Sequence, residues 1–477
     1  MPPFFTTADI LSATRGNLVQ GHADAAFAGV STDSRTCQAG DLFIPLKGER
    51  HDGHEYVPKA LDRGVRGVVV EEKWLFEGRT GGTQPPVSGP LPHTPKEVTL
   101  IAVPDTLAAL GDLARAWRSR FSIPVVALTG SCGKTTAKEM TARVLSGAYR
   151  VLKNELNLNN LIGLPQTLLK LDAGYTAAVV EMGMNRFGEI QRLTAISQPA
   201  VGVLLNVYPA HTEGVGCVEG VACAKGELIA GLPSTSVLVY NADDPRVACR
   251  AGFFPGRTLS FGLGSGAALR ARSRQSLGRG GQTALLTWQE KSWPLKLKAP
   301  GLHQLLNALA ATAVGLLLGV APEETAQALA EFQPVQRRSQ IVTLPSGVHL
   351  MNDCYNANPG SMAMALRTLK ELKDGGRAAA ALGDMLELGA HAVAQHRELG
   401  KLAAALDLDL LVAYGNFKEH VAAGAAEGGL SKNRVIPVQD REEGVRVLKD
   451  FLRPGDWLLV KGSRSMHMEC IVEALGG

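Results

Sequence analysis

Short apolar runs alternate with amphipathic stretches along most of the chain. A helical pattern over residues 106–120 leads into the apolar run 125–129, and another helical pattern follows at 135–145. Apolar runs of this length between amphipathic helices are typical of parallel strands that are buried on both faces. The same alternation predicts further strands at residues 67–70, 177–180, 201–205, 237–240, 348–352, 378–382, 410–413 and 457–460.

Two stretches depart from this alternation. Residues 283–288 and 293–298 alternate apolar and polar side chains, which predicts an antiparallel hairpin at a sheet edge. Residues 77–96 are rich in Gly, Pro and Thr and predict an exposed loop. We therefore expect an α/β protein of three domains, with a small α/β domain, a central mostly parallel sheet and a second α/β repeat. The expected boundaries are 1–104, 105–334 and 335–477.

Length and composition narrow the class of protein. A chain of 477 residues, 45% hydrophobic and 20% charged, has the composition of a globular protein with more than one core. A net charge of +4 gives no electrostatic case for binding nucleic acid. We find no apolar run that could cross a bilayer and no signal peptide at the start. Seven cysteines without a CxxC pair argue against disulfides and structural zinc, so we expect a cytoplasmic protein.

The most specific chemical pattern is the loop TGSCGKTT, which follows the strand at 125–129 directly. A strand, a glycine-bounded turn and a helix point backbone N–H groups at an anion, and the lysine and first threonine can reach phosphates and Mg²⁺. Leu128 stands where the general Walker pattern has glycine, and a glycine turn with a chance Lys-Thr pair is the alternative. The nucleotide-binding residues expected here are Thr129, Gly130, Ser131, Cys132, Gly133, Lys134, Thr135 and Thr136.

Polar groups at the carboxyl ends of two further strands can complete a metal site. The strand at 177–180 runs into Glu181, and the strand at 201–205 leads to His211. With Thr135 at the same sheet edge, these groups could hold Mg²⁺ on the phosphates of ATP. The alternatives are that Glu181 caps the next helix, that His211 is a surface side chain, and that Lys225 is an ordinary solvated lysine.

Several motifs together resemble the Mur ligases and their folylpolyglutamate synthetase relatives, over nearly the whole chain. They are TGSCGKTTAKEM, NELNLNNLIGLP, AKGEL, GLHQLLNALAA and NDCYNANPGSM. The resemblance implies a uridine-nucleotide-binding first domain, an ATP-binding central domain and a Rossmann-like third domain that brings the incoming amine. It also implies ATP, two Mg²⁺ ions and a carbamylated lysine at Lys225. The third domain would have to close onto the central one for both to contact ATP.

The resemblance also assigns roles to individual positions. It makes Lys134, Lys225 and His211 catalytic, and Thr135, Glu181, His211 and Lys225 the metal ligands. Asn307, Asp353 and Arg338 would contact ATP, with Arg337 as the alternative arginine. The acceptor-binding residues would be Ser31, Asp33, Ser34, Arg35, Lys47, Asn159 and Asn160, and the residues binding the incoming amine Tyr355, Asn356, Asn358, Ser463 and Arg464.

Three features are similar to the family members that add D-alanyl-D-alanine to UDP-MurNAc-tripeptide. They are the DCYNAN form of the aspartate motif, LGDMLELG at 382–389 and KGSRSMHME at 461–469. The resemblance then implies an ATP-dependent ligase that works through an acyl phosphate, and we expect a monomer. The alternatives are another amide ligase of the same fold and a non-catalytic nucleotide-dependent module.

Cys132 lies at the expected start of a helix and next to Lys134. A positive helix end and an ammonium group both favour the thiolate, which predicts a lowered thiol pKa. The alternative is a small residue that packs away from the ligand.

Overall fold

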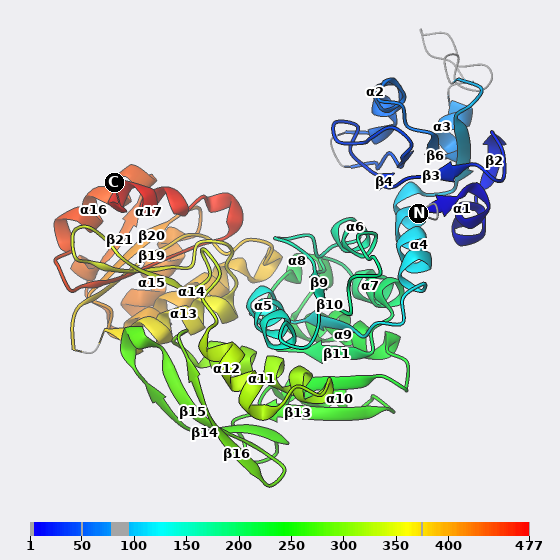
Figure 1. Ribbon diagram of the computed structural model, residues 1–477. Coiled ribbons are helices and arrows are strands. Elements are labelled where there is room, and N and C mark those ends of the chain that lie inside the picture. The colour runs from blue at the N-terminus through cyan, green and yellow to red at the C-terminus, as the bar shows by residue number, and fades with distance from the viewer. Residues whose placement is uncertain (1–3, 49–50, 78–94, 374, 477) are drawn as a thin grey trace. The chain divides into compact units, whose positions relative to one another are not determined.

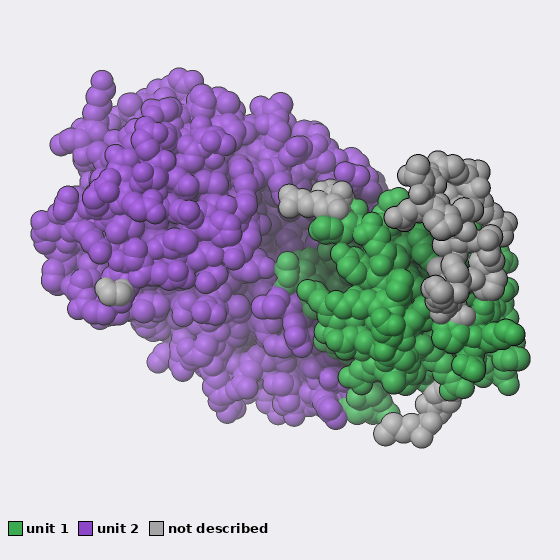
Figure 2. Space-filling model, turned by 90° about the horizontal axis from the view of Figure 1, so that it is seen from above, with its two compact units in different colours: residues 1–122, 157–174, 195–198 green, residues 123–156, 175–194, 199–477 purple. Residues whose placement is uncertain are grey.

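The structure is a computed structural model that describes residues 4–48, 51–77, 95–373 and 375–476 (Figure 1). The loop expected at 77–96 lies almost wholly outside the described residues. The chain divides into two compact units, shown in green and purple in Figure 2. The first unit comprises residues 1–122, 157–174 and 195–198, and the second unit comprises residues 123–156, 175–194 and 199–477.

The first unit is built on a five-stranded sheet in the order β2-β7-β6-β5-β4, which is parallel except for the β2–β7 pair. Val68 and Val70 of β6 pack with Val57 and Ala60 of α2 in one apolar core. Because β6 and β7 are buried along nearly their whole length, their sequences are continuous apolar runs. The elements are β1 (Phe5–Thr6), α1 (Thr7–Thr14), β2 (Asn17–Gln20), β3 (Ala26–Phe27), β4 (Val30–Ser31), β5 (Leu42–Phe43), α2 (Val57–Asp62), β6 (Gly67–Glu71), α3 (Glu72–Glu77), β7 (Thr99–Val103), α4 (Thr106–Arg118) and α6 (Gly163–Leu168).

The second unit contains a nine-stranded sheet in the order β16-β15-β14-β13-β12-β11-β8-β10-β9. From β9 through β14 in this order, neighbouring strands are parallel, whereas the β14–β15 and β15–β16 pairs are antiparallel. The β15–β16 pair at the edge confirms the predicted hairpin. Val126 and Leu128 of β8 pack with Met140 of α5 and Leu305 of α11 in the core. The elements are β8 (Val125–Thr129), α5 (Lys134–Leu145), β9 (Val151–Lys153), β10 (Ala177–Glu181), α7 (Glu189–Ser197, whose last residues belong to the first unit), β11 (Val201–Leu204), α8 (Thr212–Val215), α9 (Val218–Gly231), β12 (Val237–Asn241), α10 (Pro245–Ala251), β13 (Arg257–Gly262), β14 (Leu269–Ser276), β15 (Gln282–Trp288), β16 (Lys291–Leu297), α11 (Leu302–Leu317) and α12 (Pro322–Ala330).

A six-stranded sheet, in the order β17-β18-β22-β19-β20-β21, follows in the same unit and is parallel except for β17. Along β19, Ala378 and Ala380 face the core under α13, α14 and α15, while Ala379 and Ala381 face the core under α16 and α17. Helices therefore cover both faces of this sheet. The elements are β17 (Gln340–Thr343), β18 (His349–Asn352), α13 (Pro359–Leu372), β19 (Ala378–Leu382), α14 (Ala392–Ala405), β20 (Leu410–Tyr414), α15 (Lys418–Glu427), β21 (Val435–Val438), α16 (Arg441–Phe451), β22 (Trp457–Lys461) and α17 (Glu469–Gly476).

These sheets confirm the predicted α/β class with mostly parallel strands. The second unit holds both the nine-stranded and the six-stranded sheet, so the domain boundaries expected near residues 104 and 334 stay a prediction. Across the described ranges, none of the helices combines the length and the apolarity that a membrane span requires.

Candidate active site

The predicted phosphate loop joins β8 to α5. Gly133 has a φ of +79°, in the left-handed region, and a Cβ built there would lie 2.5 Å from Asn307 Oδ1, so only glycine fits. The Lys134 ammonium donates to the carbonyl of Gly130 at 2.9 Å. A helix that begins directly at this turn offers unpaired backbone N–H groups to an anion. Asn307, predicted to contact the nucleotide, thus lies against the loop.

Asn206, which follows β11, holds the loop in shape and was not among the predicted site residues. Its backbone carbonyl accepts from Ser131 N–H at 3.0 Å, and its side-chain oxygen accepts from Cys132 N–H at 2.9 Å. Its side-chain nitrogen donates to the carbonyl of Cys132 at 3.0 Å. An asparagine directly after a buried strand was the only signal in the sequence. It did not reveal that the partners lie more than 70 positions earlier.

The predicted lowering of the Cys132 pKa is wrong. Burial raises the pKa of this thiol to about 12, although the nearby Lys134 charge acts in the opposite direction. The Cys132 Sγ also donates to Asn206 Oδ1 at 3.4 Å, and a hydrogen bond given by the thiol favours its neutral form. The desolvation of the group therefore outweighs the helix end and the ammonium.

Thr135 and Glu181 meet as predicted at the carboxyl ends of β8 and β10. The Thr135 hydroxyl donates to Glu181 Oε2 at 2.8 Å, and only 2% of Glu181 is exposed. The Asn154 side chain fixes the Glu181 backbone, because it accepts from the Glu181 N–H at 2.9 Å and donates to its carbonyl at 3.0 Å. Two oxygen ligands of the kind that Mg²⁺ prefers therefore lie together at the start of α5.

Lys225 is a buried residue of α9 and not a solvated lysine. Its exposed fraction is 1%, and the described residues offer its ammonium no hydrogen bond or ion pair. Burial holds the pKa of Lys225 well below its usual value, and the Lys134 charge lowers it further, while Glu181 opposes the shift. Burial likewise lowers the pKa of Lys134. Two amines and one carboxylate thus share a poorly solvated region.

His211 contacts the loop that follows β19. Its Nδ1 lies 2.6 Å from Glu387 Oε2, and this contact lowers the pKa of Glu387. The neighbouring Thr212 hydroxyl donates to the carbonyl of Leu388 at 3.0 Å. The structure therefore places His211 at a contact between the central and C-terminal parts of the second unit, and its role as a metal ligand stays a prediction.

The residues present fit one Mg²⁺ ion better than two. Thr135 and Glu181 supply adjacent oxygen atoms, whereas an ammonium at Lys225 cannot bind a cation. Within the part of the chain that is described, no three His, Cys, Asp or Glu side chains gather closely enough to hold a metal ion. A second site at Glu181 would need Lys225 in an anionic form.

The predicted acceptor-binding residues belong to the first unit. The Asp33 carboxylate binds the Arg35 backbone N–H at 2.8 Å and its guanidinium at 2.8 Å, and these bonds lower the pKa of Asp33 to about 2. Gln166 of α6 donates to the Thr32 hydroxyl at 2.6 Å, which joins the serine-aspartate loop to the asparagine-rich segment. Neither Thr32 nor Gln166 was predicted. Of the remaining predicted residues, Ser31 ends β4 and Ser34 lies in the loop that follows it. The backbone of Lys47 forms an isolated antiparallel bridge with that of Asp52, and Asn160, next to Asn159, accepts from the N–H of Gly163.

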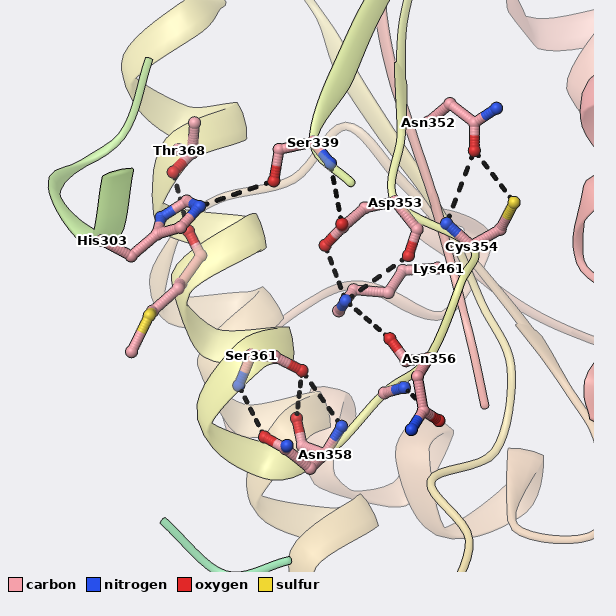
Figure 3. A network of polar contacts seen from close by, with 12 residues as sticks. His303, Ser339, Asn352, Asp353, Cys354, Asn356, Asn358, Ser361, Thr368 and Lys461 are labelled. Carbon is pink, nitrogen blue, oxygen red and sulfur yellow. Dashed lines mark hydrogen bonds and ion pairs between the residues drawn. The ribbon is translucent and has the colours of Figure 1, made fainter. Parts of the chain in front are cut away.

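Asp353 lies at the carboxyl end of β18 in a connected polar network (Figure 3). One carboxylate oxygen accepts from the Ser339 N–H at 2.8 Å, and the other from Lys461 Nζ at 2.6 Å. Lys461, at the end of β22, also donates to the carbonyl of Asn356 at 2.9 Å. On the opposite side, His303 Nε2 lies 3.5 Å from the Ser339 hydroxyl. Lys461 and His303 were not predicted as site residues.

The residues predicted to bind the incoming amine lie in loops at the same edge of the six-stranded sheet. Asn358 caps α13 and also donates from its side-chain nitrogen to the carbonyl of Ser131 at 3.1 Å. Ser463 accepts from the Leu386 N–H at 2.9 Å. This edge therefore contacts the phosphate loop, and the closure expected during turnover stays a prediction. Of the others, Asn356 bonds Lys461, Arg464 pairs with Glu469, and Tyr355 stacks on Arg338.

Comparisons with known proteins agree with this geometry. The model of the Mur ligase family catalytic domain matches residues 26–118, that of the Mur ligase middle domain residues 128–315, and that of the Mur ligase glutamate ligase domain residues 337–464. The UDP-N-acetylmuramoyl-tripeptide–D-alanyl-D-alanine ligase of Bacillus subtilis (strain 168) is 33% identical over 471 residues, which are 98% of each chain. The Escherichia coli (strain K12) ligase of the same name is 34% identical over 473 residues, again 98% of each chain.

Solved structures give the same result. MurF from Acinetobacter baumannii superposes with a TM-score of 0.87 at 30% identity, over 99% of this chain and 98% of that one. The MurF ligase from Thermotoga maritima in complex with ADP has a TM-score of 0.80 at 28% identity, over 94% and 97% of the two chains. With three family models in order along its length and relatives that match nearly end to end, this chain belongs to the Mur ligase family.

Proposed function

We propose that this protein joins D-alanyl-D-alanine to UDP-N-acetylmuramoyl-tripeptide at the expense of ATP. The observation that carries the proposal is the match to curated ligases of that name over 98% of both chains. The phosphate loop supports it, because Lys134 and the Thr135–Glu181 pair lie where a nucleotide and its metal would bind. The MurF ligase that was solved with ADP supports the use of ATP.

The acceptor carboxylate is a poor acylating agent, so the reaction requires that it be activated first. An oxygen of the acceptor carboxylate would attack the γ-phosphorus of ATP, forming a P–O bond while the bond to the ADP oxygen breaks. The free amine of the dipeptide would then attack the acyl carbon of the acyl phosphate. A C–N bond forms, the amine loses a proton, and the C–O bond to phosphate breaks. Such transfers depend chiefly on positioning and on neutralising charge.

Residues of the central and C-terminal sheets can supply both the positioning and the charge neutralisation. Lys134 would stabilise negative charge on the transferred phosphoryl group, and Asp353 would bind the ribose. Of the two neighbouring arginines, we assign Arg338 to the phosphates, because Arg337 is engaged by Glu469. The Arg338 charge also reaches Lys134, whose pKa it lowers.

Thr135 and Glu181 would hold a Mg²⁺ ion, with His211 and Lys225 as the further predicted ligands of a second ion. When bound, such ions neutralise phosphate charge and let two anionic groups approach each other. We retain the acceptor-binding role of the first unit, the dipeptide-binding role of Asn356, Asn358, Ser463 and Arg464, a monomeric state and a cytoplasmic location as parts of the proposal. The seven free cysteines support a reducing compartment.

We also propose that Lys225 acts as a carbamate. The depressed pKa of this buried lysine favours the neutral amine, which is the form that attacks carbon dioxide. An N–C bond forms, one proton leaves, and the product carries anionic oxygens that suit Mg²⁺. Lys225→Ala should lose most ligase activity and recover part of it with short-chain carboxylic acids. ¹³C NMR of the wild type in ¹³C-bicarbonate should show a carbamate signal that the variant lacks, and a signal common to both would remove this proposal.

One assay separates the candidate functions. ADP release is measured with ATP and Mg²⁺ while acceptor and amine are each supplied or omitted. We expect release only with UDP-MurNAc-tripeptide, and full turnover only when D-alanyl-D-alanine is also present. A preference for UDP-MurNAc-dipeptide and one amino acid would indicate an earlier ligase, and a folate with glutamate a folylpolyglutamate synthetase. ADP release at the same rate with and without each of these substrates would indicate a nucleotide-dependent module.

A further inference from the structure

Two neighbouring arginines before β17 have separate environments. Arg337 Nη1 lies 3.3 Å from Glu469 Oε1, and its backbone N–H donates to Gln340 Oε1 at 3.3 Å. The Arg338 guanidinium lies on the ring of Tyr355, with its carbon 3.8 Å from the ring centroid. No carboxylate among the described residues pairs with Arg338. The Arg337 side chain is therefore held by an ion pair, and the Arg338 side chain by contact with an aromatic ring.

The backbone on both sides of Arg338 is strained. Arg337 has a φ of +60° and Ser339 a φ of +51°, both in the left-handed region that side chains other than glycine rarely adopt. Two of the bonds that hold this conformation run from the Ser339 N–H to Asp353 Oδ1 at 2.8 Å and from the Tyr355 N–H to the carbonyl of Arg337 at 3.3 Å. Strain that is held in this way tends to occur at functional sites. Here the strained backbone directs the Arg338 side chain away from that of Arg337 and onto the ring of Tyr355.

The strand register explains why the two side chains meet. Gln340 of β17 pairs with Asn352 of β18, so the residues just before β17 lie beside those just after β18. This is the sheet edge at which Asn358 contacts the phosphate loop. A guanidinium that is stacked on a ring keeps the N–H groups at its edge available for phosphate oxygens.

We propose that Tyr355 is a positioning residue for phosphoryl transfer, whose ring holds the Arg338 guanidinium in the orientation that meets the phosphates of ATP. The proposal rests on the ligase function above. It replaces the expectation that Tyr355 binds the dipeptide. The aromatic face is the functional part of the side chain, so phenylalanine should replace tyrosine but leucine should not.

A double-mutant cycle tests the proposal. Tyr355→Phe should retain kcat within about twofold, whereas Tyr355→Leu should lower kcat about tenfold, as expected for a half-buried cation–π contact. The KM for D-alanyl-D-alanine should not change. In the Arg338→Ala background, Tyr355→Leu should have less than a twofold further effect. The matched control is Tyr175→Leu, because Arg150 lies over the Tyr175 ring at 5.0 Å in the same unit, and kcat should be unaffected.

Binding measurements keep the test independent of turnover. Tyr355→Leu and Arg338→Lys should both weaken a non-hydrolysable ATP analogue several-fold more than they weaken ADP, and Arg338→Lys remains informative if the leucine variant fails to fold. Effects of Tyr355→Leu and Arg338→Ala that multiply independently, or a raised KM for the dipeptide with kcat intact, would overturn the positioning role. A wild-type protein without ligase activity would instead refute the proposed function, while the binding comparison would still decide the role of Tyr355.

Discussion

Removing the buried Lys461 ammonium should destabilise the six-stranded sheet. Its side chain is 3% exposed and that of its partner Asp353 12%, and the two form an ion pair at 2.6 Å. Lys461→Met would leave the Asp353 carboxylate with the Ser339 N–H as a donor. It would also remove the Lys461 donor from the carbonyl of Asn356. Breaking one side of a buried pair costs ~3–5 kcal/mol, because the remaining charge stays buried without compensation.

Hydrogen exchange at the amides of β18 and β22 would measure this loss where it occurs. A loss of that size speeds exchange by roughly two to four powers of ten, since each ~1.4 kcal/mol is a factor of ten. Lys401→Met, which removes an exposed pair with Glu398 and Glu427, is the matched control and should leave exchange unchanged. Adding Asp353→Asn to Lys461→Met should restore much of the protection. If Lys461→Met exchanged no faster than the control, the buried pair would contribute nothing and this reasoning would fail.

Three further predictions concern the phosphate loop and its neighbourhood. Asn206→Leu removes three side-chain hydrogen bonds with Cys132 and should weaken ADP binding about 10- to 100-fold by calorimetry; unchanged affinity would show that the loop keeps its shape without them. Cys132→Ser should keep ligase activity. Maleimide labelling followed by mass spectrometry should find the exposed cysteines modified before Cys132, and modification of Cys132 first would contradict its raised pKa. Burial lowers the pKa of His303 from 6.5 to about 4, so the stability it contributes is complete above pH 6.5 and is lost as the pH falls through 4. Denaturation of His303→Asn should show a shallower decline over this window than the wild type, and equal slopes would count against the assignment.

Strands that are buried on both faces were the most predictable part of this fold. The apolar runs at 125–129 and 378–382 coincide with β8 and β19, because Pro124 and Gly130 bound the first run and Arg377 and Gly383 bound the second. β14, in which only Leu269 and Ala271 are buried, has no such run and was missed. Hydrophobic periodicity reflects burial, and β14 buries few side chains although strands flank it on both sides.

The site was predictable where chemistry is local in sequence and hidden where it is not. The glycine turn with Lys134 is a contiguous motif, whereas Lys461 acquires its role from a carboxylate 108 positions earlier. The error at Cys132 has the same origin. Adjacent residues suggested a thiolate, but the acceptor that favours the thiol is Asn206, 74 positions away.

The Asn358 side chain makes two hydrogen bonds with different partners, and this restricts which residues can replace it during evolution. Its side-chain oxygen accepts from the Ser361 N–H at 2.9 Å to cap α13, and its nitrogen donates to the carbonyl of Ser131. Serine, threonine and aspartate cap helices about as well, and for the helix alone they would be nearly neutral replacements. Aspartate, however, has no N–H to offer, and the shorter hydroxyl side chains cannot accept and donate in two directions over the same reach. A position that helix capping would leave open to several residues is thus narrowed to one by a second partner in another part of the fold.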